Sequence, residues 1–521
     1  VFEILSNDMQ GLEVCVYYKG ESCENGEVQK WFFELPKVTI DLNFNEGGQV
    51  QTDTPLENLK YGNNVWINLI PDEGMRVGEF EGCESITYFE GLENSNITLQ
   101  INNISESCQL NVRFIKEDGL TASERLGIVD PTIKSCIDDM YRYYPEFSES
   151  LSCYGNEIST LQGVENMHLL TYISLSNTTL SEQATSELST FTQIESLGLN
   201  DVIAGHLDLS KMHRLNSLYV YGAELSGIEI PKLKGITHLY LENTSLSSID
   251  LSGLEGLYAL SVKGSNISAL DVTDNINLTS LDITYSSVER IDGFSNVHQL
   301  RDLEAYSSNL ASLNITPLRL IRNVRINETK VQELDLSSSS SLESLWADNS
   351  QLSKLTLSDD GYDKLNTLSL SNTALTELDL RKFSGLTYLD ISNTGISSLD
   401  LSQNTLLRSL KAAGTKLAGL TVNELPQLVR LDLSNNPLEK LNFTSKLESL
   451  SELKLNDTKI TSLDFTFMDE NLRDVEFMNN SLSSVVALEN LTYPANFWLT
   501  GTQVSDAIVQ ELESYGHYVT K

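Results

Sequence analysis

Apolar and polar residues follow a short pattern that recurs along most of the chain. In residues 386–405 the apolar positions are Leu386, Leu389, Ile391, Ile396, Leu399 and Leu401, and close variants run from about Leu170 almost to the C-terminus. The first apolar position recurs every 21 to 23 residues, at Leu215, Ile236, Leu257, Leu278, Leu300, Ile321, Leu342, Leu365, Leu386, Leu407, Leu428, Leu450 and Leu472. A fixed period of this size predicts a solenoid.

Each unit contains two very short alternating segments, Leu389-Asp390-Ile391 and Leu399-Asp400-Leu401 in the example. Alternation over so few residues predicts short strands with one buried face, so each coil can add one strand to each of two parallel ladders. A column of small polar residues lies between them, at Thr244, Ser265, Ser286, Ser308, Thr329, Ser350, Thr373, Thr394, Thr415, Asn436 and Thr458. Such side chains can bond backbone groups that a bend leaves unpaired. One coil cannot bury its own leucines, so stability must come from stacking.

The pattern L-x-x-L-x-L-x-x-(N/T/S)-x-L-x-x-L-D-L resembles the bacterial 21-residue class of leucine-rich repeats and, more loosely, the internalins. The resemblance covers roughly residues 130–521. It implies a leucine-rich-repeat solenoid with short parallel strands and little helix. Binding unites this family, but no single ligand does.

The first 116 residues lack the repeat and predict β structure. Residues 1–36 predict a β-hairpin around a turn at 19–26, and residues 37–116 predict a small all-β module with strands between Gly and Asn turns. The second segment resembles the divergent β-repeat modules found beside internalin-type solenoids. The matching residues are Gly62, Pro71-Asp72-Glu73-Gly74, Phe80-Glu81-Gly82-Cys83, Cys108 and Phe114.

Helical caps are predicted at both ends of the solenoid. Residues 117–165 form the predicted N-cap, because Asp130-Pro131 is typical of a helix start and apolar residues follow at helical spacing. The solenoid proper then spans 166–500, with extra residues at 179–191 and 358–364 expected as outward loops. Residues 501–521 predict a C-terminal capping helix beginning near Ser505, with Ile508, Val509, Leu512 and Tyr515 on one face. We therefore expect both ends of the solenoid to be sealed.

All six cysteines lie in the first 153 residues. We predict the sequential pairs Cys15–Cys23, Cys83–Cys108 and Cys136–Cys153. Their spacing lacks C-x-x-C and nearby His ligands, so we expect no metal site and favour an oxidising, secreted or cell-surface setting.

Charge narrows the classes of partner. The chain has 35 Lys and Arg against 73 Asp and Glu, a formal net charge of −38. Nucleic-acid binding needs a positive surface, so no nucleic-acid partner is expected. No run of 18 apolar residues is present, so direct membrane insertion is not expected either.

No enzyme motif stands out. The histidines are scattered, and the sequence has no H-E-x-x-H, no G-x-S-x-G and no P-loop. We predict no catalytic residues, no enzyme activity and no cofactor.

Two outward columns remain as candidate chemistry. The predicted ligand-binding residues on the leading strand are Tyr219, Tyr221, His238, Tyr240, Tyr306, Arg325 and Trp346. Aromatic residues also suit strands for packing reasons, so this column fits either a simple sheet cover or a ligand face. The second column is Asp250, Asp271, Asp335, Asp379, Asp400 and Asp464, whose carboxylates could be solvated or bridged by cations.

The leading hypothesis is a surface or secreted binding protein that recognises a macromolecule, most simply a protein such as one on a host-cell surface. The alternative is a glycan-binding protein or a structural spacer of the cell surface or biofilm, with a polysaccharide as partner. The aromatic column supports either form of recognition, because Tyr and Trp rings serve at protein hot spots and also stack on sugars.

Overall fold

The computed structural model describes the backbone of strands β1 (Phe2–Asp8), β2 (Gly11–Val16) and β3 (Lys30–Glu34), and then residues 37–84, 86–90, 96–141, 144–232, 235–358 and 360–521. Contacts divide the chain into two compact units. One comprises Val1–Cys153 and Thr160–Leu170, and the other comprises Tyr154–Ser159 and Thr171–Lys521. The finer domain boundaries expected from the sequence stay predictions.

The first three strands form an antiparallel sheet in the order β1-β2-β3. β2 pairs with β3 from Gly11 opposite Glu34 to Cys15 opposite Lys30, so these strands are the two arms of the expected hairpin. Cys23 lies outside the described residues, and the Cys15–Cys23 bond stays a prediction.

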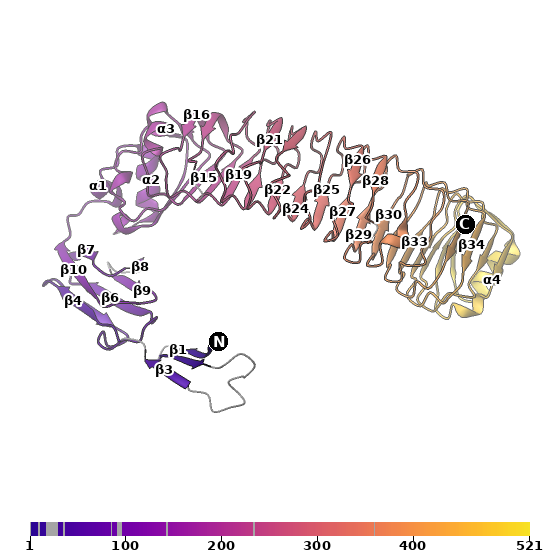
Figure 1. Ribbon diagram of the computed structural model, residues 1–521, viewed down its shortest axis with the longest axis horizontal. Coiled ribbons are helices and arrows are strands. Elements are labelled where there is room, and N and C mark those ends of the chain that lie inside the picture. Colours follow the sequence, from indigo (N-terminus) through magenta and orange to yellow (C-terminus); the bar gives the residue numbers. More distant parts are fainter. Residues whose placement is uncertain are drawn as a thin grey trace. The chain divides into compact units, whose positions relative to one another are not determined.

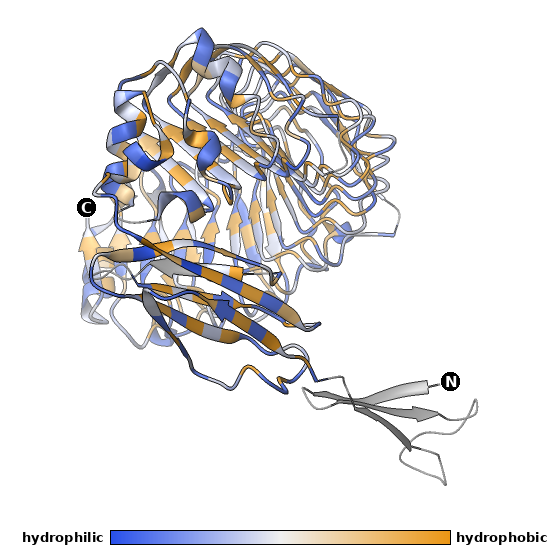
Figure 2. Cartoon of the chain, turned by 90° about the vertical axis from the view of Figure 1, so that its left-hand side faces the viewer, coloured by the Kyte–Doolittle hydropathy of each residue, from blue (hydrophilic) through white to orange (hydrophobic). Residues whose placement is uncertain are grey.

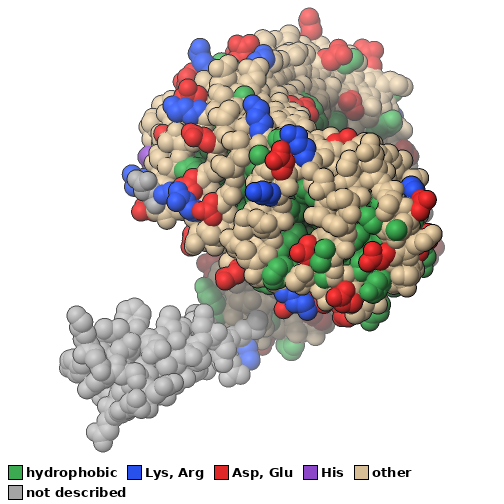
Figure 3. All heavy atoms as spheres, turned by 90° about the vertical axis from the view of Figure 1, so that its right-hand side faces the viewer, with side chains coloured by type: hydrophobic (Ala, Val, Ile, Leu, Met, Phe, Trp, Pro, Cys, Tyr) green, Lys and Arg blue, Asp and Glu red, His purple; other side chains and the backbone are tan. Residues whose placement is uncertain are grey.

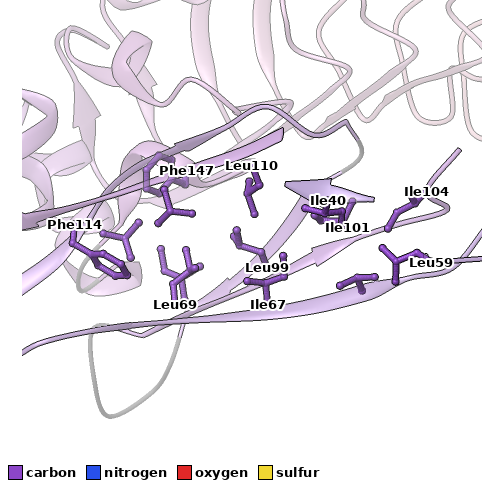
Figure 4. Close-up of a cluster of buried hydrophobic side chains, with 14 of the residues drawn as sticks. Ile40, Leu59, Ile67, Leu69, Leu99, Ile101, Ile104, Leu110, Phe114 and Phe147 are labelled. Atoms are coloured by element: carbon purple, nitrogen blue, oxygen red, sulfur yellow. The ribbon is translucent and has the colours of Figure 1, made fainter. Parts of the chain in front are cut away.

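The following module is built from two small sheets. One has the order β4 (Ile40–Phe44), β10 (Cys108–Lys116), β7 (Met75–Glu81), and the other has the order β5 (Gly48–Thr52), β6 (Val65–Pro71), β9 (Ile97–Ile101), β8 (Ile86–Glu90). Apolar and polar residues alternate along these strands (Figure 2). The inward residues, among them Ile67, Leu99 and Leu110, form one buried cluster (Figure 4). The predicted Cys83–Cys108 disulfide is confirmed.

The core of this module also takes in residues from beyond it. Tyr144 and Phe147 belong to the same buried cluster, and the Tyr144 hydroxyl accepts the Val77 N–H at 3.0 Å. Phe147 packs on Phe80 with ring centroids 4.6 Å apart. The segment expected to belong to the cap therefore completes the core of the module.

The cap region contains α1 (Ala122–Leu126), α2 (Pro131–Met140) and the short 3-10 helices η1 (Pro145–Phe147) and η2 (Val164–Asn166). Asp130 begins α2 as expected, and its carboxylate accepts the N–H groups of Thr132 and Ile133 at 2.8 and 3.1 Å. The sequence analysis missed α1, whose N-cap Thr121 and Glu124 form a reciprocal capping box.

The side chains of Cys136 and Cys153 contact each other. This contact, followed by burial, raises the pKa of Cys153 far above its ordinary value. The Cys153 thiol is therefore a poor nucleophile. The Cys136–Cys153 disulfide stays a prediction.

The solenoid is confirmed, and its coils stack one on the next (Figure 1). Its long sheet has 18 strands, in the order β11 (Ser150–Tyr154), β13 (Tyr172–Ser176), β15 (Ser196–Asn200), β17 (Ser217–Tyr221), β19 (His238–Glu242), β20 (Ala259–Ser261), β22 (Ser280–Asp282), β24 (Asp302–Glu304), β25 (Asn323–Arg325), β27 (Ser344–Trp346), β29 (Thr367–Ser369), β30 (Tyr388–Asp390), β31 (Ser409–Lys411), β33 (Arg430–Asp432), β35 (Glu452–Lys454), β37 (Asp474–Glu476), β40 (Asn496–Trp498) and β42 (Tyr518–Thr520). From β13 onward all neighbours pair in parallel.

The second ladder is interrupted, whereas the sequence predicted a continuous one. Its strands are β12 (Glu157–Ile158), β14 (Thr179–Leu180), β16 (Ile203–Asp208), β18 (Glu224–Glu229), β21 (Ala269–Asp271), β23 (Arg290–Asp292), β26 (Glu333–Asp335), β28 (Lys354–Thr356), β32 (Gly419–Val422), β34 (Lys440–Phe443), β36 (Ser462–Asp464), β38 (Ser481–Leu482), β39 (Ser484–Val486) and β41 (Gln503–Val504). The first four form one sheet, and the others form isolated pairs. Residues 399–401 are no strand, although their pattern matches coils that have one.

Most of the inward polar column satisfies backbone groups as predicted, but the buried hydroxyls of Thr244 and Ser265 have no hydrogen-bond partner among the residues that the structure describes. The hydroxyls of Ser286, Ser308, Thr329, Ser350, Thr373, Thr394, Thr415 and Thr458 each donate to the carbonyl three residues earlier. The residue just before this column has a positive φ in each of sixteen coils, and it is Asn, Asp or Gly in all but three of them. Those residue types tolerate the left-handed conformation best, so each coil turns at a matched residue pair.

The two segments expected as outward loops differ from that expectation. Residues 182–188 form helix α3 (Glu182–Leu188) instead of a plain loop, with Ser181 as N-cap. In the second segment Tyr362 points inward: it is buried and donates its hydroxyl to the Leu336 carbonyl at 2.8 Å. The remaining 3-10 helices are η3 (Leu380–Lys382) and η4 (Leu488–Asn490).

The C-terminal helix α4 (Asp506–Ser514) begins after Ser505 as predicted. It buries Ile508 and Leu512, but Tyr515 is 48% exposed, so the predicted apolar face is narrower than expected. Strand β42 then follows the helix and pairs with β40. Within the described ranges, no helix has the length and apolar character that a membrane span requires.

Candidate functional site

The long sheet presents a regular outward face. In a typical strand such as β19, Leu239 is buried while His238 and Tyr240 on either side are half-buried. Parallel pairing places equivalent residues of successive coils beside each other, as with Tyr219 opposite Tyr240. Because side chains alternate between the two faces of a strand, the first and third residues of each strand form two outward columns.

Four of the predicted ligand-binding residues gather at one place on this face. The rings of Tyr219 and Tyr240 stack with centroids 5.2 Å apart and planes 7° from parallel. His238 lies 6.3 Å from Tyr240 and 6.0 Å from Tyr258. Tyr221 is the next outward residue of β17 and is 50% exposed. We call these five side chains the aromatic patch.

Tyr258 was missed in the sequence analysis because it precedes strand β20 and so lies just outside the expected column. Its ring is 51% exposed and contacts His238. The sequence did hold a signal for Tyr258. It directly follows Leu257, the first apolar position of its unit, and the strand begins at the residue after it.

The other three predicted residues belong to a second group farther along the sheet. The Arg325 guanidinium lies 6.0 Å from the centroid of the Trp346 ring. The rings of Tyr306 and Tyr285 pack edge to face, with their centroids 5.1 Å apart. The strands β20 and β22, which carry Ser261 and Asp282 at the third position, separate this group from the aromatic patch. The seven residues therefore form two groups instead of one continuous stripe.

The Tyr240 phenol is held in its neutral form. Burial raises the pKa of Tyr240, and the neighbouring Tyr219 and Glu242 raise it further. The patch thus offers apolar ring surface with hydroxyls that can hydrogen-bond to a partner.

Later coils carry charges at the same outward positions. Lys454 of β35 lies 2.8 Å from Glu452 and 2.9 Å from Glu476, and Arg430 lies 3.2 Å from Glu452. These two carboxylates raise the pKa of Lys454. We call these residues the charged ladder. Lys and Arg side chains also alternate with Asp and Glu on the C-terminal end of the solenoid (Figure 3).

The Asp column has a local structural role. In Asp250, Asp271, Asp335, Asp379, Asp400 and Asp464, one carboxylate oxygen accepts the N–H two residues later, at 2.8 to 3.2 Å. These are Asx turns, which stabilise the bend after the second segment of the unit. Hydrogen bonds from Lys232 and Ser252 lower the pKa of Asp250 to about 2. In the described part of the chain, no group of three or more His, Cys, Asp or Glu is placed to hold a metal ion.

Comparison with known proteins shows the fold but not the ligand. No protein-family model matches the sequence, and no curated protein matches it. A leucine-rich-repeat protein of Leptospira interrogans has a similar structure, with 18% identity over 72% of this chain and 90% of that chain and a TM-score of 0.52. The functional domain of InlJ from Listeria monocytogenes, which includes a cysteine ladder, is similar with 22% identity over 67% of this chain and 73% of that chain and a TM-score of 0.50. These similarities show that the chain folds as a leucine-rich-repeat solenoid like that of InlJ.

Proposed function

We propose that this protein is a secreted or cell-surface binding protein that recognises a protein ligand through the outward face of its long sheet. The observation that carries the proposal is the aromatic patch, in which Tyr219, Tyr221 and Tyr258 are each at least 41% exposed. Tyr and Trp dominate protein-binding hot spots.

The stacking within the patch supports recognition of a preformed surface. Tyr219 and Tyr240 hold each other in place, so these two side chains would lose little freedom when a partner contacts them. If these aromatic residues served only to pack over the strands, their rings would not need to be exposed to solvent. The Cys83–Cys108 disulfide supports an oxidising compartment.

Glycan recognition is the competing form of this function. Aromatic rings can stack on sugars, but the parallel contact between Tyr219 and Tyr240 already occupies one face of each ring. This geometry favours a protein ligand over a polysaccharide.

A capture experiment tests the proposal. The oxidised protein is immobilised and exposed to host-cell surface extract and to extracellular polysaccharide, beside the triple variant Tyr219→Ala, Tyr221→Ala, Tyr240→Ala. The matched control is Asp432→Ala, Lys454→Ala, Glu476→Ala, which changes three residues of the same outward column in later coils.

We expect a protein captured by the wild type and by the control, but lost with the aromatic variant. Capture that free oligosaccharide abolishes would instead indicate a glycan ligand. Equal capture by all three forms, or none, would contradict the proposal and favour a structural spacer.

A further inference from the structure

A hollow on the long sheet lies beside the second group of outward residues. Asp282, Glu304, Arg325 and Trp346 occupy the third position of four successive strands and pair in register. Tyr285 and Tyr306 also line the hollow, together with Lys263, Thr284 and Asn327. The hollow therefore joins carboxylates to aromatic rings within one surface depression.

Glu304 lies at the centre of this hollow, and its charge is incompletely compensated. Its side chain is 30% exposed, and Arg325 reaches it at 3.5 Å. Burial raises the pKa of Glu304, Asp282 and Asp302 raise it further, and Arg325 opposes the shift. A second cation beside Glu304 would stabilise its ionised carboxylate.

The charges close to Glu304 are unequal in number. Asp282 and Asp302 are the carboxylates that act on it, and Arg325 is the cation that does so. Three carboxylates, counting Glu304, against one guanidinium leave a negative excess at this point, in partly buried surroundings where Coulomb attraction is stronger than in water. Lys263 is the second cation among the residues that line the hollow.

Arg325 shows which chemistry the hollow accommodates. Its guanidinium lies between the Trp346 ring, at 6.0 Å, and Glu304, at 3.5 Å. Glu304 has Asp282 as its neighbour on the other side. On the Asp282 side of Glu304, the hollow therefore has two carboxylates and the rings of Tyr285 and Tyr306 but no arginine.

The turns at this place break the rule of the other coils. At the turn position before the inward polar column, three left-handed residues are neither Asn, Asp nor Gly. They are Tyr285, Ser307 and Glu328, with φ of 56°, 51° and 57°, and they occupy three successive coils. An ordinary side chain in this conformation costs on the order of 1 kcal/mol. Tyr285 and Glu328 border the hollow or contact its wall, so the strained turns coincide with it.

We infer that this hollow receives an arginine side chain of the protein partner, seated between the Asp282 and Glu304 carboxylates and the Tyr285 and Tyr306 rings. The inference rests on the proposed function, since it specifies part of the same protein contact. Arginine fits better than lysine because its planar guanidinium bonds carboxylates in a bidentate way and also stacks on rings. The negative excess supplies the charge complementarity.

A peptide probe tests the inference without knowledge of the partner. The full chain is labelled with 5-fluorotryptophan, and the ¹⁹F signal of Trp346 is assigned with Trp346→Phe. Acetyl-Gly-Arg-Gly-amide is titrated against it, together with the same peptide carrying citrulline, a neutral analogue of arginine.

Two charge-matched variants accompany the titration. Asp282→Asn with Glu304→Gln removes the two carboxylates of the hollow. Asp432→Asn with Glu476→Gln removes the two carboxylates that pair in register with Lys454 in the same outward column, with the same change in net charge. We call this double change the ladder variant.

We expect the arginine peptide to shift the Trp346 signal at millimolar concentration, and the citrulline peptide to bind at least tenfold more weakly. The hollow variant should lose this response at least tenfold, and the ladder variant should keep it. Equal responses to both peptides, equal losses in both variants, or no shift of Trp346 would overturn the inference.

The two proposals fail separately. If the capture experiment identifies a protein held by the aromatic patch while the arginine peptide leaves Trp346 unchanged, only the arginine site is wrong. If the arginine peptide binds as expected and nothing is captured, the proposed function is wrong.

Discussion

Two stretches of the long sheet have the same backbone and differ in how their outward side chains are satisfied. In the charged ladder, Lys454 lies between Glu452 and Glu476 at 2.8 and 2.9 Å, so each charge has a partner from its own chain. From β17 to β27, several aromatic rings are exposed to solvent, and Glu304 has one arginine beside it but two acidic neighbours. The comparison shows that equivalent positions of one solenoid face can carry side chains paired within the chain in one stretch and side chains available to a partner in another.

The turns repeat this contrast. Asn435 occupies the left-handed position beside the charged ladder, whereas Tyr285, Ser307 and Glu328 occupy it in the open stretch. The open stretch thus combines unsatisfied charge with backbone strain, two properties often concentrated at functional sites.

The largest expected effect concerns the inward face, which should be the same in both stretches. Leu345→Ala and Leu453→Ala each remove a buried side chain, exposed by 0% and 2%. We expect each to lower the free energy of unfolding by about 2–5 kcal/mol, measured by urea denaturation. A cost in only one stretch would show that the two stretches differ throughout and not only on the outer face.

A smaller effect is expected when the turn residues are exchanged. Glu328→Asn should stabilise the protein and Asn435→Glu should destabilise it, each by about 1 kcal/mol, because Asn tolerates the left-handed conformation better than Glu. Thermal and urea unfolding measure both. Destabilisation by Glu328→Asn would mean that the contacts of Glu328 with Tyr306 and Ser307 outweigh the strain.

The contribution of ion pairing in the charged ladder can be tested at Lys454, which lies between Glu452 and Glu476. Lys454→Met removes the shared partner of Glu452 and Glu476, and we expect a loss of about 1 kcal/mol in the free energy of unfolding. Lys263→Met, at the rim of the hollow, should cost less than half of that. Similar losses for both would indicate that the ladder gains nothing from its arrangement.

The smallest expected effect is a pH dependence at Glu304. Burial raises its folded-state pKa, so ionisation of Glu304 opposes folding at neutral pH, and this penalty disappears as pH falls through that pKa. Glu304→Gln should therefore stabilise the protein slightly at pH 7, by less than about 1 kcal/mol. The gain should vanish near pH 4. A gain that grows on acidification would contradict the assignment.

Part of this protein was predictable from residues alone. The repeat period, the inward leucines and the hydroxyl column followed from the sequence because each depends on contacts within one coil or between identical neighbours. The caps at Asp130 and Ser505 were predicted for the same reason, since a cap is a bond to a backbone N–H two or three residues away.

Other features depended on the tertiary structure. The local role of the Asp column appeared only in the structure, where each carboxylate accepts the N–H two residues later. The sharing of Tyr144 and Phe147 with the module core required contacts between distant segments.

The division of the outward residues into an aromatic patch and an acidic hollow was decided by the tertiary structure as well. Periodicity gives every coil the same column, but the partners of a side chain are set by the coils on either side. The negative charge of Glu304 is only partly balanced, because its neighbour in the preceding coil is Asp282 and only its neighbour in the following coil, Arg325, is a cation. The sequence by itself therefore determined the solenoid, while the chemistry of its face arose from stacking residues that lie 21 or 22 positions apart.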